Sequence, residues 1–131
     1  MNNITVGEII GRCDPDTVVK VMIGRSVDDA LAGSGGILFN IDRHTVASDH
    51  RLLSDALVIT VDDSTGEDDP NIRRYRDKGM TYAQARVMHL RNLGYEQSEI
   101  ADMENTTRAA IQKREDLAKK KIGRTMFYER R

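Results

Sequence analysis

The sequence lacks several features that would assign it to a broad class of protein. It has one cysteine, Cys13, no tryptophan, and only four tyrosines and two phenylalanines in 131 residues. A single cysteine cannot form an internal disulfide and has no CxxC partner for zinc, which agrees with a reducing compartment. The few aromatic residues permit only modest hydrophobic cores, so we expect one domain or two small ones.

Long hydrophobic runs are also missing. No stretch is apolar enough to span a bilayer, and the N-terminus MNNITVGEII lacks the basic and hydrophobic regions of a secretion signal. We therefore expect a protein of the cytoplasm, or of the host cytoplasm if it is viral, with no membrane partner.

Charge is unevenly distributed along the chain. Residues 1–70 carry five Lys and Arg against thirteen Asp and Glu, a balance of −8, whereas residues 71–131 carry fifteen against eight, a balance of +7. Such asymmetry suggests two modules with different partners. The basic module would approach phosphate and the acidic one would not.

The fold class predicted for the chain is α+β, with a small α+β module at residues 1–61 followed by an all-α module. Thr5-Val6-Gly7-Glu8 has the pattern of a capping box, which begins a helix. Short runs rich in β-branched residues favour strands, and short connections between them disfavour most parallel crossovers. We expect a mainly antiparallel sheet with strands at 18–23, 37–41 and 56–61, and a second helix from Ser26 through Leu31.

No catalytic, cofactor or metal site is predicted in this module, and we expect the protein not to be an enzyme. Residues 33–36, Gly-Ser-Gly-Gly, lack the lysine and the strand-then-helix order of a phosphate-binding loop. Asp42, His44, Asp49 and His50 have metal-ligating side chains, but without a second cluster a solvated loop is the usual outcome.

An acidic segment, residues 62–72, is predicted to link the two modules. Five acids, a glycine and a proline between Asp62 and Pro70 cannot bury apolar area. The alternative is functional, because an acidic linker tethered to a basic DNA-binding face can compete with phosphate. The residues that follow, 73–79, form a basic arm in which Arg74 and Arg76 are expected to lie along the DNA backbone or in the minor groove.

The stretch from Gly94 to Ile122 has the spacing of a helix-turn-helix followed by a long basic helix. If Gln97 is the first position of a bihelical unit, Ile100 and Ala101 are fourth and fifth, Asn105 is ninth and Ile111 is fifteenth. The isoleucines would hold two crossed helices together, and the alanine must be small where the second helix packs over it. Position nine requires a residue that can enter the left-handed region, as asparagine can.

The second helix of this unit should present the residues that contact DNA. Thr106 is expected to cap it, which places Thr107, Arg108, Gln112 and Lys113 on the outward N-terminal face. Arginine pairs with guanine and glutamine with adenine through two hydrogen bonds each. The predicted DNA-binding residues are Thr106, Thr107, Arg108, Gln112, Lys113, Gln97, Arg74, Arg76 and Lys120.

The segments MTYAQARVMHLRNLGYEQSEIA and NTTRAAIQKREDLAKKKI resemble the helix-turn-helix of the fourth conserved region of sigma factors and of archaeal Tfx-type regulators. This resemblance covers about the last third of the chain, and it implies that the second helix enters the major groove. Glu96 stands where these families have a Ser or Thr cap. The opening TVGEIIGRCDPDTVVKVMIG resembles small phage-encoded proteins, which implies a viral or mobile-element origin.

The function predicted from these features is that of a DNA-binding transcriptional regulator, with double-stranded DNA as its partner. One bihelical unit covers only a few base pairs, so we expect a homodimer, a larger assembly or a complex with RNA polymerase. Two alternatives stay open. The unit could bind polymerase and modulate it with little DNA affinity of its own, or it could serve as the interaction module of a viral structural or packaging protein.

Overall fold

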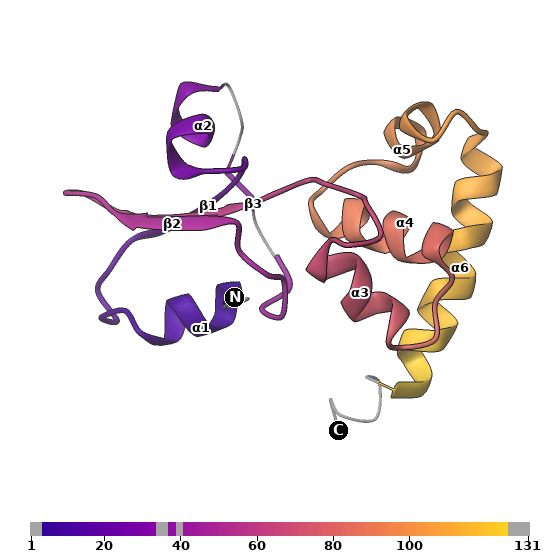
Figure 1. Cartoon of the computed structure of the whole chain (residues 1–131), viewed down its shortest axis with the longest axis horizontal. Helices are drawn as coiled ribbons and strands as arrows, with labels where there is room; N and C mark the ends of the chain where they lie inside the picture. Colours follow the sequence, from indigo (N-terminus) through magenta and orange to yellow (C-terminus); the bar gives the residue numbers. More distant parts are fainter. Residues whose placement is uncertain (1–3, 34–36, 39–40, 126–131) are drawn as a thin grey trace. The chain divides into compact units, whose positions relative to one another are not determined.

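A computed structural model describes residues 4–33, 37–38 and 41–125 of the chain. The chain divides into two compact units, Met1–Asp63 and Ser64–Arg131. The first unit combines helices with a small sheet and the second is helical, which confirms the predicted α+β class with a C-terminal helical module (Figure 1).

The first unit is built on a mixed sheet of three strands in the order β1-β3-β2. Strand β1 (Val19–Ile23) pairs in parallel with β3 (Leu57–Val61), and β2 (Asp49–Leu52) pairs with β3 in antiparallel fashion. All five residues of β3 are buried. A central strand covered on both faces is expected to be a continuous run of β-branched and aliphatic residues, which is the composition of β3.

Two short helices cover the sheet on opposite faces, α1 (Val6–Gly11) on one and α2 (Val27–Ala32) on the other (Figure 1). Both begin as the sequence predicts. The Thr5 hydroxyl accepts a hydrogen bond from the Glu8 amide at 3.1 Å, and the Ser26 hydroxyl accepts one from the Asp29 amide at 3.2 Å.

The prediction of a mainly antiparallel sheet is wrong, because β1 and β3 run in parallel. The residues between these two strands include α2 and β2, and this connection is long enough for a parallel crossover. Part of the predicted strand 37–41 lies outside the described residues, and Ile37 forms only an isolated bridge with Met22. The antiparallel neighbour of β3 is instead β2, whose sequence DHRL has no strand signature.

In its described residues the second unit has four helices: α3 (Pro70–Arg76), α4 (Tyr82–Asn92), α5 (Gln97–Met103) and α6 (Arg108–Thr125). Thr81 caps α4 in a reciprocal arrangement with Gln84, in which each side chain bonds the other residue's backbone amide. Gly94 follows α4 with a φ of +97°, and the Tyr95 amide bonds back to the Leu90 carbonyl at 3.1 Å. Glycine adopts this left-handed ending more readily than any other residue.

The segment predicted to be a basic arm is helical. Pro70 is the first residue of α3 and the Asp69 carboxylate accepts a bond from the Asn71 amide at 2.8 Å, so the helix begins inside the predicted linker 62–72. Ile72 and Tyr75 of α3 are buried against α4 and α6. The prediction of an arm rests on the charges of the segment alone. Its apolar residues Ile72 and Tyr75 attach it to the helical unit.

No described helix is both long enough and apolar enough to cross a membrane.

Candidate nucleic-acid interface

Helices α5 and α6 are joined by a tight turn with the backbone geometry that the spacing predicts. Asn105 has a φ of +55°, in the left-handed region, and it is the only non-glycine residue with positive φ among those described. The Thr106 amide closes the turn by donating to the Ala101 carbonyl at 2.9 Å. Asparagine tolerates this conformation better than most residues because its short polar side chain can bond locally.

The two helices are held together by the residues assigned to that role from the sequence. Ile100 and Ile111 are fully buried, and Ala101 is 4% exposed. They form one cluster with Val87 and Leu90 of α4, and Tyr95 packs against it. The cluster fixes α6 on two preceding helices, so the side chains at its N-terminal end have a defined position.

The cap of α6 is Thr107, and the prediction of Thr106 is wrong. The Thr107 hydroxyl accepts from the Ala110 amide at 3.2 Å, and its carbonyl accepts from the Ile111 amide at 3.2 Å. The turn therefore takes one residue more than predicted, and Thr106 contributes its backbone amide to the turn. Thr107 keeps an exposed side chain at the end of the helix.

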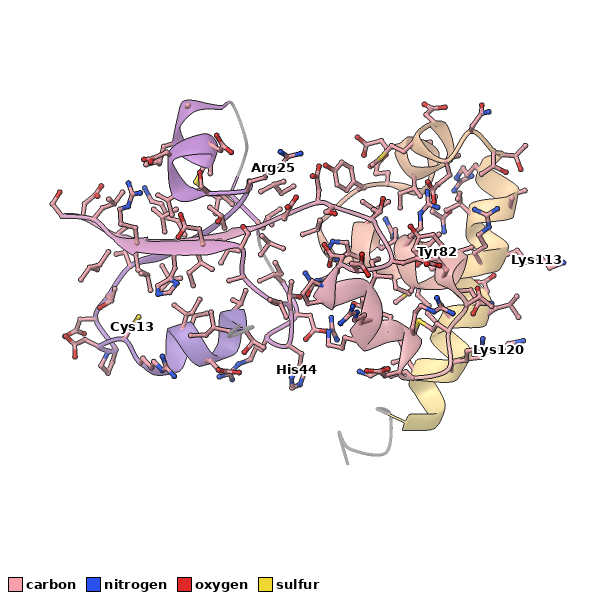
Figure 2. All side chains as sticks on the ribbon, in the orientation of Figure 1. Cys13, Arg25, His44, Tyr82, Lys113 and Lys120 are labelled. Atoms are coloured by element: carbon pink, nitrogen blue, oxygen red, sulfur yellow. The ribbon has the colours of Figure 1, made fainter. Side chains whose placement is uncertain are left out.

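The N-terminal end of α6 presents an exposed polar face. Arg108, Gln112 and Lys113 are all exposed, as is Ala109 between them. Lys113 projects from α6 away from α3 and α4, as Figure 2 shows. Lys120, also exposed, projects from the same helix further along (Figure 2). Four of the predicted DNA-binding residues, Thr107 included, thus lie together at one end of one helix.

Gln97 lies at the start of α5, where its amide is bonded inside the protein. Gln97 Nε2 donates to Glu115 Oε1 at 2.9 Å. Glu115, on α6, is 3% exposed. Its carboxylate also forms ion pairs with Arg91 Nε of α4, at 3.2 Å, and with Lys119 Nζ, at 2.9 Å. Glu115 therefore connects α4, α5 and α6 through charged or polar contacts.

The pKa of Glu115 is held below its ordinary value. Burial alone would raise the pKa, but the hydrogen bonds from Gln97 and Lys119 and the charges of Arg91 and Lys119 outweigh it. The carboxylate is accordingly ionised at neutral pH. Sequence reasoning missed this residue, because position 115 was considered only as part of a basic helix and the contact with α5 is tertiary.

The remaining predicted residues are distributed over α3 and the end of α6. Arg74 stacks its guanidinium on the Tyr75 ring, 4.3 Å from the ring centroid. Arg76 is exposed and lies 3.6 Å from the Glu67 carboxylate, and its neighbour Arg73 lies 3.5 Å from Asp68. The acidic segment thus neutralises part of α3. Lys120 lies on α6, two turns from Lys113.

A cavity of about 300 Å³ opens beside the N-terminal end of α6. It is lined by Arg91 of α4, by Glu96, Gln97 and Ser98 at the start of α5, and by Arg108. The sequence gives no sign of it, because its walls come from three separate helices.

In the described part of the chain, no three His, Cys, Asp or Glu side chains gather closely enough to hold a metal ion. Asp49, one of the residues considered, accepts the Val27 amide at 2.9 Å and the His50 amide at 2.8 Å. Its carboxylate therefore shapes the start of α2 and the adjoining backbone.

No protein-family model, curated protein or solved structure matches the chain.

Proposed function

We propose that the second unit binds double-stranded DNA by placing the N-terminal end of α6 in the major groove, as a regulator of transcription. The observation that supports this most directly is the combination of a buried α5–α6 junction with an exposed polar end on α6. Ile100 and Ile111 fix the junction, while Arg108 and Gln112 extend from it into solvent. A recognition helix requires this arrangement, because base readout depends on side chains held at a fixed angle to the groove.

The proposed division of roles follows from side-chain chemistry. Arg108 and Gln112 can each form two hydrogen bonds with a base edge, and Thr107 and Lys113 can add single contacts. Lys113 and Lys120 supply attraction to the phosphate backbone that weakens as salt is added. Arg74 and Arg76 are less available than the sequence suggested, since one is stacked on a ring and the other lies beside Glu67.

The test is selection of bound duplexes from a random DNA library by the full chain, followed by affinity measurements on the enriched duplex. We expect an enriched motif, and we expect Arg108→Ala to cost about 1–3 kcal/mol of binding free energy and to relax the preference at one base pair. Lys120→Ala is the matched control, because loss of a phosphate contact weakens binding to all sequences about equally. An absence of any enrichment would contradict base readout.

A second candidate is a unit that binds a protein, RNA polymerase included, through the same helices. The exposure of two apolar side chains supports it: Met103 at the end of α5 is 48% exposed and Leu117 of α6 is 39% exposed. Co-purification with polymerase in the absence of an enriched DNA motif would favour this candidate. Large oligomers detected by light scattering would favour a viral structural protein.

A further inference from the structure

The cavity beside α6 has a lining suited to an anion. Arg91 and Arg108 border it from two helices, and Ser98 and Gln97 contribute polar groups. At about 30 Å³ for each water molecule, a volume of about 300 Å³ has room for roughly ten waters, or for an anion with part of its hydration shell.

Arg91 is held in one orientation at this cavity. Its Nε lies 3.2 Å from Glu115 Oε1, and its Nη1 donates to the Tyr95 carbonyl at 2.9 Å. Within the described residues these contacts engage Nε and Nη1, so Nη2 is the guanidinium nitrogen that could donate a hydrogen bond to a ligand in the cavity. A guanidinium fixed in this way loses little conformational entropy when it binds an anion.

Glu115 is itself fixed by side chains of α4, α5 and α6. Gln97 Nε2 and Arg91 Nε share one carboxylate oxygen, and Lys119 Nζ lies 2.9 Å from the other. Because a buried carboxylate needs these partners, it has little freedom to move away from Arg91. The contacts link the orientation of Arg91 on α4 to the positions of α5 and α6.

We propose that this cavity is a subsite for a phosphodiester group of the DNA backbone, contacted by Arg91 and Ser98, and that buried Glu115 is the positioning residue that orients Arg91 toward it. The proposal rests on the proposed DNA-binding function and adds to it. A phosphate held between α4 and α5 fixes the register of the protein on the duplex, while the end of α6 contacts the bases.

Glu96 is the one acidic residue among the described residues that line the cavity, and it is exposed. Its charge opposes an incoming phosphate and offsets part of the attraction of the two arginines. Glu96→Gln is therefore expected to tighten DNA binding, and weaker binding in this variant would contradict a phosphate in the cavity.

Three further substitutions in the full chain test the subsite by DNA affinity and its salt dependence on the enriched duplex. Arg91→Ala should weaken binding about tenfold and reduce the salt slope by about one. Arg25→Ala removes an exposed arginine of the first unit (Figure 2) and is the matched control for the lost charge. It should leave the DNA affinity and its salt slope nearly unchanged. Ser98→Asp should weaken binding at least tenfold through repulsion, and an acidic residue in the first turn of α5 is compatible with folding.

Glu115→Gln tests the positioning role, because two accounts predict opposite signs. Removing a negative charge near DNA should tighten binding if only net charge matters. Loss of the Arg91 orientation should instead weaken DNA binding, by about threefold to tenfold. Adding Glu115→Gln to the Arg91→Ala variant should then cause no further loss of affinity. Tighter binding, or an equal loss in both backgrounds, would overturn the positioning role. If Glu115→Gln does not fold, Ser98→Asp and Arg91→Ala still decide the subsite.

Failure of this proposal is distinguishable from failure of the proposed function. An enriched motif with wild-type affinity in Arg91→Ala and Ser98→Asp would overturn the subsite and leave base readout intact. Without an enriched motif, the Arg91 Nε–H resonance of the full chain is followed by NMR while a short duplex of arbitrary sequence is added. A saturable shift that is lost in Ser98→Asp would support the phosphate subsite without base readout, and no shift would overturn both.

Discussion

Replacing Ile111 by alanine should destabilise the helical unit severely. Ile111 is fully buried among Val87, Leu90, Ile100 and Ala101, with helices on either side that cannot close over a vacancy. Three buried carbon groups at about 0.8 kcal/mol each give roughly 2.4 kcal/mol, and the cavity left behind brings the expected cost to about 3–4 kcal/mol. A unit of this size has a total stability of about 3–10 kcal/mol, so much of it would be lost.

The chain offers a selective optical probe for this experiment. Its four tyrosines all belong to the second unit and it has no tryptophan, so tyrosine fluorescence reports on unfolding of that unit. Urea titrations of the full chain would give the free energy of unfolding, and thermal scans should show a midpoint lowered by roughly 12–32 °C.

Leu117→Ala is the matched control for Ile111→Ala. Both residues are aliphatic and lie on α6, but Leu117 is 39% exposed and outside the cluster. Its replacement should cost less than about 1 kcal/mol, because little apolar surface returns to water. If Ile111→Ala also costs less than about 1 kcal/mol, or if the two variants are equally unstable, the assigned packing of α5 against α6 is wrong.

Three further outcomes follow from the same unit and are measured by the same tyrosine fluorescence. Thr107→Ala should lower the free energy of unfolding by about 0.5–2 kcal/mol, because it removes a helix cap, and Thr106→Ala should lower it distinctly less. A larger loss in Thr106→Ala would show that Thr106 is the cap. Asn105→Ala should cost about 1–2 kcal/mol because its φ is +55°, while Asn105→Gly should change little, and equal tolerance of both would contradict the left-handed turn. Glu115 has a folded pKa below its unfolded value, so its contribution to stability is present above about pH 4.3 and is lost as pH falls through the folded pKa. Urea midpoints between pH 7 and pH 3 should fall less steeply in Glu115→Gln than in the wild type, and parallel curves would contradict the assigned ionisation.

The sequence predicted the helical unit better than the sheet, for physical reasons. Helix signals are local: Thr81 caps α4, Gly94 ends it, and Asn105 marks the turn, each through groups a few residues away. Strand formation depends on pairing with residues far away in the sequence, so the sequence did not predict β2. The sequence DHRL forms a strand because it borders β3, and its Asp49 also caps the start of α2.

The candidate interface was predicted in part. Arg108, Gln112 and Lys113 lie where helical spacing placed them, on an exposed end of α6. The positions of Gln97 and Arg74 were beyond sequence reasoning, since one depends on a carboxylate that lies 18 residues away and the other on stacking with a ring. Charge alone marks a residue as a DNA contact without indicating whether a partner inside the protein already holds it.

The most direct test of base readout by α6 is to compare the DNA motifs selected from a random library by the wild-type chain and by Arg108→Ala. We expect the wild type to enrich one motif, and the variant to enrich the same motif with the preference lost at a single base pair. An unchanged motif with uniformly weaker binding would make Arg108 a phosphate contact. The absence of a motif with either protein would contradict recognition of DNA sequence by this helix.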